Sequence, residues 1–190
     1  MSLSVVPINI SAARAWIEAH HSHLHAPLGG LCAVAIATDT RICCVAMLSR
    51  PVSRVLQASG VCAEINRVAS DGTAPHAASK AIGALARAGI ALGYRRLVSS
   101  TLLGEAGTSY RAAGWWPAAV DLRERDWIRS DGERDAAVQP GAKVRWAFGP
   151  DALPIDPSVD ALVRASVGVV ALRDRPDNLP LFSRTVEARP

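Results

Sequence analysis

A cluster of histidines is the most conspicuous group of chemically active side chains in this sequence. Four of them fall within six residues: His20, His21, His23 and His25. Glu18 precedes them, and the four-residue step from His21 to His25 would put two imidazoles on one helical face, as metal ligands require, if the helix continued. Pro27 argues that it stops. Three interpretations stay open: structural packing, an acid/base or substrate-binding role for His21 and His25, and a metal site, although we assign no metal ligand.

Glu64 is a second candidate. It lies within the apolar run 61–69, where an unpaired carboxylate would be costly, so we expect it to pair with Arg67 or to face an open cavity. A carboxylate that pairs with Arg67 would be a structural ion pair, and the sequence leaves both interpretations open.

A third group of residues could bind an anion. Asp71-Gly72 predicts a turn, and a helix begins soon after it, at about residue 76. The start of a helix presents unpaired N–H groups and the positive end of the helix dipole, which suit a pyrophosphate, and small side chains let a phosphate come close. The expected contact set is Thr73, His76, Ala77, Ala78, Ser79 and Lys80. An ordinary helical crossover without a ligand is the alternative.

The first half of the chain predicts strands around one helix. Residues 3–10 have the pattern of a strand, and Ser11 is a good N-cap for a helix over 12–20. Two apolar, β-branched runs, 31–38 and 41–49, are separated by a tight turn. They predict an antiparallel hairpin.

The middle of the chain predicts a strand–helix–strand unit. Apolar residues recur at three- and four-residue steps over 76–92, which indicates a helix between the strand-like runs 61–69 and 96–102. Two strands joined by one helix are expected to be parallel. The remaining elements expected in this part are a short helix over 108–113 and an antiparallel pair of strands over 115–122 and 143–148.

The composition changes after Gly149-Pro150. We therefore divide the chain into a domain over 1–149 and an appendage over 150–190, formed by a linker, a helix and a loose tail. Asp156 as N-cap and Pro157 as first residue predict that helix over 158–172. Its apolar face needs a partner, either the core of the same chain or a second copy, which would make a homodimer.

Composition narrows the class of protein. The chain has 190 residues, of which 49% are hydrophobic and 20% charged, so it can bury one real core. No apolar run is long enough to span a bilayer, and the N-terminus has no signal-peptide pattern, so we expect a cytoplasmic protein. The net charge of +4 is compatible with an anionic co-substrate or a nucleic acid and proves neither.

From Glu64 to Trp115 the sequence resembles the GNAT superfamily of acyl-CoA-dependent N-acyltransferases, and the resemblance covers roughly residues 12–148. It is most similar to a group of small bacterial and phage proteins with a Glu and an Arg on a strand, then Thr/Ser-Asp-Gly-Thr, then a long helix that ends Ala-Leu-Gly-Tyr-Arg-Arg-Leu. Here these are Glu64, Arg67, residues 70–73 and residues 91–97, followed by GEAGTSYRAAGW. More distantly, the group is similar to the phage Mom protein, which modifies adenine in DNA.

The resemblance implies a mixed α/β fold with a GNAT-type central mixed sheet of six or seven strands, flanked by helices and splayed between two parallel strands. Acyl-CoA would lie in the split and contact Val68, Ala69 and Ser109 besides the residues at the helix start. One departure concerns the pyrophosphate loop. Most family members have a basic residue or Gln, two spacers, Gly, a spacer and then Gly or Ala, whereas residues 73–79 are TAPHAAS.

The resemblance also gives Tyr110 a role. Tyr110 stands four residues before Gly114-Trp115, matching the family's Tyr-x-x-x-Gly-aromatic segment, in which the tyrosine commonly protonates the departing CoA thiolate. A phenol with a pKa near 10 suits that task. Packing against the short helix is the alternative.

We therefore expect an enzyme that transfers acetyl from acetyl-CoA to an amine by direct attack in a ternary complex. Glu64 or a histidine would deprotonate the amine through water, and Arg67, Trp127 and Arg129 would bind the acceptor. Trp127 and Arg129 lie in the charged loop over 123–135, which borders the acceptor in this fold; the alternative for Trp127 is that it covers the sheet edge. Two alternatives remain: Mom-like modification of a nucleobase, and a non-catalytic GNAT-fold module that binds a partner or a nucleic acid.

Overall fold

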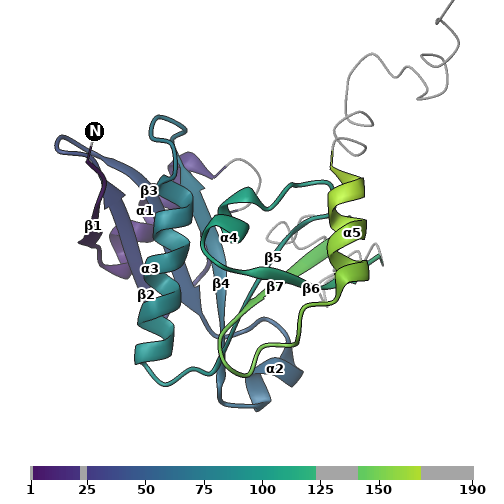
Figure 1. Ribbon diagram of the computed structural model, residues 1–190. Coiled ribbons are helices and arrows are strands. Elements are labelled where there is room, and N and C mark those ends of the chain that lie inside the picture. Colours follow the sequence, from purple (N-terminus) through teal and green to yellow (C-terminus); the bar gives the residue numbers. More distant parts are fainter. Residues whose placement is uncertain (1, 22–24, 123–140, 168–190) are drawn as a thin grey trace, which may run out of the picture.

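The computed structural model describes residues 2–21, 25–122 and 141–167 (Figure 1). Their strands form one seven-stranded sheet in the order β1-β2-β3-β4-β5-β7-β6. The strands are β1 (Ser4–Pro7), β2 (Cys32–Ala37), β3 (Ile42–Ser49), β4 (Cys62–Ser70), β5 (Arg96–Leu102), β6 (Trp116–Asp121) and β7 (Lys143–Phe148). The helices are α1 (Ile10–His20), α2 (Arg54–Ala58), α3 (Ala77–Ala91), α4 (Thr108–Ala112) and α5 (Pro157–Ser166). The mixed α/β class expected from the sequence is confirmed.

Neighbouring strands pair antiparallel except at the centre of the sheet. β2 and β3 form the expected hairpin. β4 and β5 are parallel, as predicted for two strands that one helix connects. β7 inserts between β5 and β6 and is antiparallel to both, which makes the sheet mixed.

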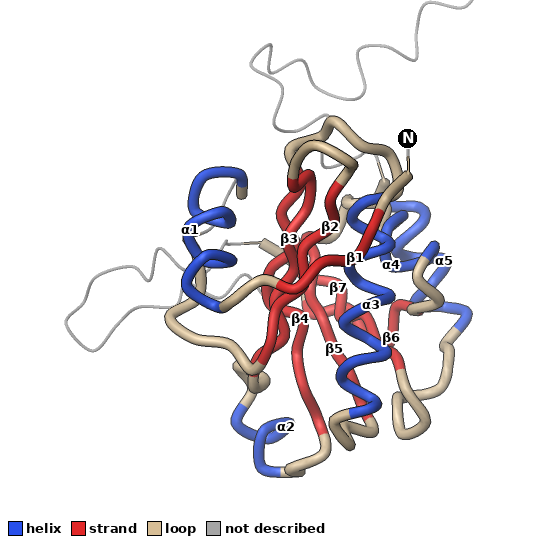
Figure 2. Tube along the Cα trace, turned by 90° about the vertical axis from the view of Figure 1, so that its left-hand side faces the viewer, coloured by secondary structure: helices blue, strands red, loops and turns tan. Residues whose placement is uncertain are grey.

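The two faces of the sheet carry different helices. α3 and α4 lie on one face and α1 on the other (Figure 2). α1 begins at Ile10, two residues before the prediction, because the side chain of Asn9, and not that of Ser11, accepts the hydrogen bond from the backbone N–H of Ala12. α1 packs on β2, β3 and β4. Among the described helices, none packs over β5 and β7 on this face, which we call the α1 face.

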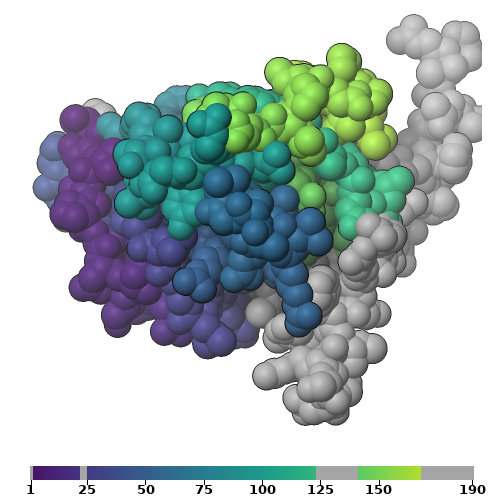
Figure 3. Space-filling view, turned by 90° about the horizontal axis from the view of Figure 1, so that it is seen from below, coloured from purple at the N-terminus to yellow at the C-terminus, as the bar shows by residue number. Residues whose placement is uncertain are grey.

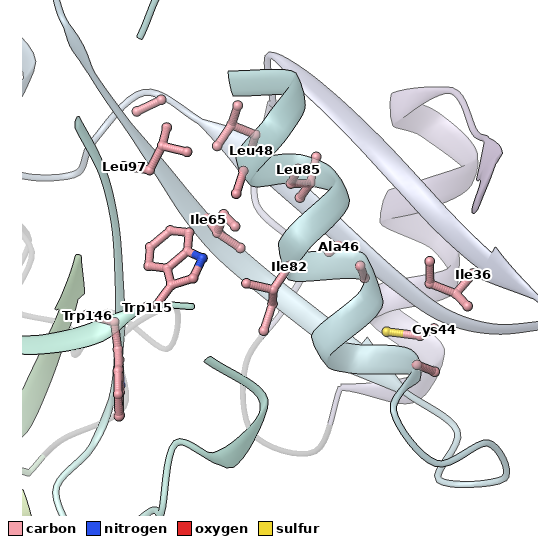
Figure 4. Packing of buried hydrophobic residues seen from close by; sticks show 14 of the residues in the cluster. Ile36, Cys44, Ala46, Leu48, Ile65, Ile82, Leu85, Leu97, Trp115 and Trp146 are labelled. Carbon is pink, nitrogen blue, oxygen red and sulfur yellow. The ribbon is translucent and has the colours of Figure 1, made fainter. Parts of the chain in front are cut away.

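The main hydrophobic core lies between the sheet and α3. Leu48, Ile65 and Leu97 from three neighbouring strands meet Ile82 and Leu85 of the helix (Figure 4). The helical periodicity that predicted α3 is the periodicity of its buried face. This packing fixes α3, and with it the turn that precedes the helix, against β4.

A smaller cluster lies under α1. Ala13 and Ile17 of the helix are fully buried against Val45 and Met47 of β3. The sheet is therefore packed on both faces in its first half.

α5 closes the opposite end of the molecule from β1 (Figures 1 and 3). Its fully buried residue, Val163, belongs to the main core, and Asp156 and Pro157 begin the helix as predicted. The helix ends at Ser166, and Val167 has an extended backbone, so the prediction is wrong at that residue; residues 168–172 lie outside the described residues. The division into 1–149 and 150–190 stays a prediction.

The sequence analysis missed α2. This helix has five residues and buries none of them, so it carries no apolar periodicity that a sequence could reveal.

Gly107, just before α4, packs directly against Trp146 of β7. Trp146 is fully buried, and its Nε1 donates to Oγ1 of Thr101 at 3.0 Å. A Cβ at Gly107 would lie 1.9 Å from Cζ2 of Trp146, and Gly107 has a left-handed φ of 60°. Position 107 therefore requires glycine for two reasons: its left-handed backbone and the lack of space for a Cβ.

Gly107→Ala should lower the free energy of unfolding by about 2–5 kcal/mol, the sum of a left-handed alanine and an overpacked indole. Denaturant titration measures the loss. Gly60→Ala is the matched control, because Gly60 also has a left-handed φ, +70°, but nothing lies within 4 Å of its added Cβ. We expect about 1–2 kcal/mol for Gly60→Ala. Equal losses in the two variants would contradict the importance of the Trp146 contact.

Candidate active site

The two parallel strands at the centre of the sheet pair briefly and then part. Their register ends with Ile65 of β4 opposite Ser99 of β5, although both strands continue beyond that pair. Backbone N–H and C=O groups past this point are not used between β4 and β5. The sheet is therefore splayed at its centre, as the resemblance implied.

A β-bulge in β4 follows at once. Met47 of β3 lies opposite Arg67 and Leu48 opposite Ile65, which leaves Asn66 as the extra residue. A bulge bends its strand, and this one does so where pairing with β5 stops. The side-chain oxygen of Asn66 is buried and has no hydrogen-bond partner among the described residues.

Tyr110 of α4 places its hydroxyl at the parting of the strands. The hydroxyl oxygen lies 2.5 Å from Oγ of Ser99, and the Ser99 hydroxyl donates to the carbonyl of Ile65 at 2.7 Å. Burial raises the pKa of Tyr110 to about 12, although the hydrogen bond with Ser99 acts to lower it. Tyr110, the predicted general acid, thus contacts Ser99 directly and is connected through Ser99 to Ile65. Ser99 and Ile65 are the last pair between β4 and β5.

Aromatic rings hold the Tyr110 ring in place. Tyr110 stacks on Trp146 with ring centroids 5.5 Å apart and meets Trp115 edge-on at 5.6 Å. Trp115 in turn stacks on Phe148. Offset stacks and edge contacts of this kind fix ring orientation, which a five-residue helix could not do alone.

The residue after Tyr110 connects α4 to the C-terminal helix. Arg111 lies over the Trp146 ring, 5.2 Å from its centroid, and its NH1 donates to Oδ1 of Asp160 at 2.5 Å. Asp160 also accepts from Nε of Arg164. α5 therefore holds α4, and so Tyr110, against the sheet.

Glu64 lies on the other face of the sheet. Its chain neighbours Ala63 and Ile65 are buried on the α3 side, and side chains alternate along a strand. The carboxylate accepts from the backbone N–H of Val52 at 2.8 Å. Burial raises the pKa of Glu64 despite that hydrogen bond. A half-buried carboxylate with a raised pKa is the expected state of a general base near neutral pH.

Three cations act electrostatically on Glu64 and lower its pKa: Arg145, Arg67 and Lys143. Lys143 and Arg145 alternate along β7 with residues buried in the core, so they lie on the face of Glu64. Arg67 donates to the carbonyls of His25 at 3.0 Å and Asn66 at 2.6 Å. The structure thus gives Glu64 an electrostatic attraction to Arg67, and the prediction that Glu64 faces an open cavity stays a prediction.

The histidine cluster separates at the end of α1. The His20 ring stacks on Trp16, while Nδ1 of His25 lies 2.5 Å from Oε1 of Glu18. α1 ends at His20 and His21 is extended, so His21 and His25 do not share a helical face. The backbone of His25, rather than its ring, is what contacts Arg67 near the candidate base.

The start of α3 has open backbone donors. Lys80 N–H donates to the His76 carbonyl, but no described group accepts from the N–H groups of Ala78 and Ser79. His76, the residue before the helix, has a left-handed φ of 65°, which no other described non-glycine residue adopts. The glycine missing from residues 73–79 is thus replaced in conformation by His76.

Side chains of the predicted anion-binding set already have partners. The backbone N–H and hydroxyl of Thr73 donate to Asp71 at 2.9 and 2.7 Å, and the Ser79 hydroxyl donates to the His76 carbonyl. The Lys80 ammonium donates to the carbonyl of Leu3. The backbone of this turn is therefore better placed to meet an anion than its side chains.

The other predicted site residues lie on β4, on α4 or outside the described residues. Val68 packs against the α3-side core and Ala69 against the α1-side cluster, both beyond the parting. Ser109 precedes Tyr110 in α4 and is half-buried. Trp127 and Arg129 lie outside the described residues.

Within the residues described, no three His, Cys, Asp or Glu side chains gather closely enough to hold a metal ion. None of the described helices is long and apolar enough to cross a membrane. The four cysteines are free thiols.

Three residues of the candidate site were not predicted from the sequence. Ser99 contacts Tyr110, Asn66 is the extra residue of the bulge, and Asp160 binds Arg111 of α4. Ser99 and Asp160 meet partners that are distant in sequence, and the bulge at Asn66 depends on strand pairing, so no local pattern could identify these residues.

The fold is similar to those of solved N-acetyltransferase structures. No protein-family profile and no curated protein matches the chain. An N-acetyltransferase from Staphylococcus aureus Mu50 matches it with a TM-score of 0.56 and 11% identity over 80% of this chain and 100% of that chain. The fold is GNAT-like.

Two further structures agree. Polyamine N-acetyltransferase of Drosophila melanogaster, which forms N-acetylagmatine, has a TM-score of 0.54 and 10% identity over 78% of this chain and 100% of that chain. A Salmonella typhimurium protein solved with its cofactor acetyl-CoA has a TM-score of 0.54 and 8% identity over 80% of this chain and 95% of that chain. At such identities the similarity establishes the GNAT-like fold alone, and the resemblance to phage Mom stays a prediction.

Asp160→Asn should destabilise the fold by about 1–3 kcal/mol, because it leaves a largely buried guanidinium without its charged partner; both side chains of the pair are 25% exposed. Hydrogen exchange should quicken in α4. The matched control is Asp151→Asn, whose pair with Arg95 is more exposed, at 57% and 38% for the Arg95 and Asp151 side chains, and should cost much less. If the two variants unfold alike and α4 keeps its protection, α5 does not hold the helix.

Proposed function

We propose that this protein is an N-acetyltransferase that transfers the acetyl group of acetyl-CoA directly to an amine. The observation that carries the proposal is the parting of β4 and β5 after Ile65 and Ser99, with the Tyr110 hydroxyl at that point. The GNAT-like fold supports it, because solved structures of N-acetyltransferases have a similar fold.

The residues present fit acetyl-CoA. The first turn of α3 would hold its pyrophosphate through the N–H groups of Ala78 and Ser79, aided by the helix dipole. The pantetheine arm contains amides, and the unpaired backbone edges of β4 and β5 offer donors and acceptors for them. The unpartnered side-chain oxygen of Asn66 is a further acceptor at the same place.

The two candidate proton-transfer groups lie on opposite faces of the sheet, which suits a direct transfer. Glu64, on the α1 face, would take one proton from the neutral amine nitrogen, through water, as that nitrogen forms its bond to the acetyl carbon. Tyr110, on the α4 face, would give its proton to the sulfur as the carbon–sulfur bond breaks. Attack and departure would then occur on opposite sides of the reacting carbonyl.

The acceptor would bind on the α1 face, near Glu64 and Arg67. His25 lies beside them, because its carbonyl accepts from Arg67. His21 or His25 is a second candidate for the base, and the acceptor itself is a small amine or an amino group of a nucleobase.

The proposal is tested with acetyl-CoA and a panel of amines. At one hundred times its Kd, acetyl-CoA should stabilise the fold by roughly 2.7 kcal/mol, read as a rise in Tm, and thiol release should depend on the amine. Tyr110→Phe should keep that Tm rise and lose about 100- to 10,000-fold in turnover, since only a proton donor is removed. No Tm rise with millimolar acetyl-CoA would contradict the proposal; unchanged turnover in Tyr110→Phe would make Tyr110 structural.

Glu64→Gln should lower kcat by about 100-fold or more while leaving the Kd for acetyl-CoA unchanged. A base must be ionised, so activity of the native chain should rise with pH through the pKa of Glu64, which burial holds above its usual value. The variant should lack this acid limb. Since the folded state binds the Glu64 proton more tightly than the unfolded chain, that group destabilises the fold as pH rises past its unfolded pKa, and Gln removes the effect. An acid limb that survives in the variant would assign the base elsewhere, and His21→Ala and His25→Ala would be the next variants.

A further inference from the structure

Ser99 is the least exposed polar residue of the site and has a partner on each side. Ser99 lies on β5 and is 1% exposed. It pairs with Ile65 in the last pair before β4 and β5 part. One contact is to the Ile65 carbonyl at 2.7 Å and the other to the Tyr110 hydroxyl at 2.5 Å.

The number of protons decides the direction of these hydrogen bonds. A serine hydroxyl has one proton, and a carbonyl can only accept, so the Ser99 proton lies on the Ile65 carbonyl. The Tyr110 hydroxyl must then be the donor to Ser99. In this resting arrangement the proton of Tyr110 points to Ser99 and not to a ligand in the split.

A buried tyrosine is a poor acid for a thiolate. Burial raises the pKa of Tyr110 to about 12, and the charges of Glu105 and Glu64 raise it too. A thiol has a pKa nearer 8.5, so the transfer is uphill unless the phenolate oxygen gains a donor as its proton leaves. Among the described residues, the Ser99 hydroxyl is the neutral donor already within hydrogen-bond distance of that oxygen.

We propose that Ser99 is a positioning residue that orients Tyr110 at rest and donates to its oxygen when Tyr110 protonates the departing thiolate. The O–H bond of Tyr110 breaks, an S–H bond forms, and the negative charge passes to the phenolate oxygen. Ser99 turns its own O–H from the Ile65 carbonyl to that oxygen without losing its proton. The proton that the amine gave to the base then returns through solvent to the phenolate, and Ser99 returns to Ile65. The inference rests on the proposed function.

The test compares Ser99→Ala with Ser100→Ala, the same change at the next residue of β5, which is exposed. We expect Ser99→Ala to lower kcat by about 10- to 100-fold, the range of a hydrogen bond to a charged group, with the Kd for acetyl-CoA unchanged. Ser100→Ala should leave kcat as it is. In the Tyr110→Phe background, Ser99→Ala should have no further effect on kcat, because the two residues act as a unit.

A spectroscopic measurement distinguishes a changed orientation of the Tyr110 hydroxyl from a general loss of structure. The chain has two tyrosines, so Tyr94→Phe leaves Tyr110 as the sole signal in a protein labelled at the phenolic carbon. Ser99→Ala should shift that carbon resonance, as loss of the acceptor for its hydroxyl requires, and Ser100→Ala should not. Circular dichroism checks that each variant is folded.

The outcomes distinguish this inference from the proposed function. No acetyl transfer and no acetyl-CoA binding by the native chain would overturn both. An active native chain with Ser99→Ala equally active, or with an equal further loss in the Tyr110→Phe background, would overturn the role of Ser99 alone. If Ser99→Ala does not fold, Ser99→Thr keeps the hydroxyl, and its resonance and kcat must stay closer to native than those of Ser99→Cys.

Discussion

Strand β4 loses its pairing with β5 after Ile65, and the candidate site depends on this loss. Backbone groups that leave a ladder in a protein interior need other partners. Here the Ser99 hydroxyl takes the Ile65 carbonyl, and the bulge at Asn66 bends β4 where the pairing stops. The parting thus leaves strand edges inside the molecule, which could pair with the amides of a ligand.

The sheet gives its two proton-transfer candidates separate surroundings. Tyr110 is enclosed by Trp146 and Trp115, whereas Glu64 lies on a face with several cations. Burial raises the pKa of both groups, but the phenol stays protonated and the carboxyl is drawn towards its ionised form by its neighbours. Opposite environments for two titratable groups are what an acid and a base require, and one layer of backbone between them is enough to create the difference.

Local sequence patterns predicted most of the fold, and they pointed to some of the residues that the fold brings to the candidate site. Apolar alternation and helical periodicity predicted the hairpin of β2 and β3, the parallel pair and α3, because burial of one face dictates those patterns. α2 lacks such a face, and the start of α1 was a choice between two good caps. At the site, Glu64 and Tyr110 were identifiable by residue type, but Ser99 meets Ile65 across 34 positions of sequence and Arg111 meets Asp160 across 49. Contacts of that separation are products of the fold and have no local signature.

The order of strands also determines when the pieces can come together during synthesis. β7 lies between β5 and β6, so β6 cannot join the sheet until the later strand has left the ribosome. β1 to β5, with α1 and α3, are made first and can bury their own core. The indole of Trp146, on which the Tyr110 ring stacks, arrives only with β7, and Asp160 later still. A nascent chain would therefore form the first five strands and the turn that precedes α3 before it completes the surroundings of Tyr110. In a chain interrupted before β7, the ring of Tyr110 would lack Trp146, on which it stacks.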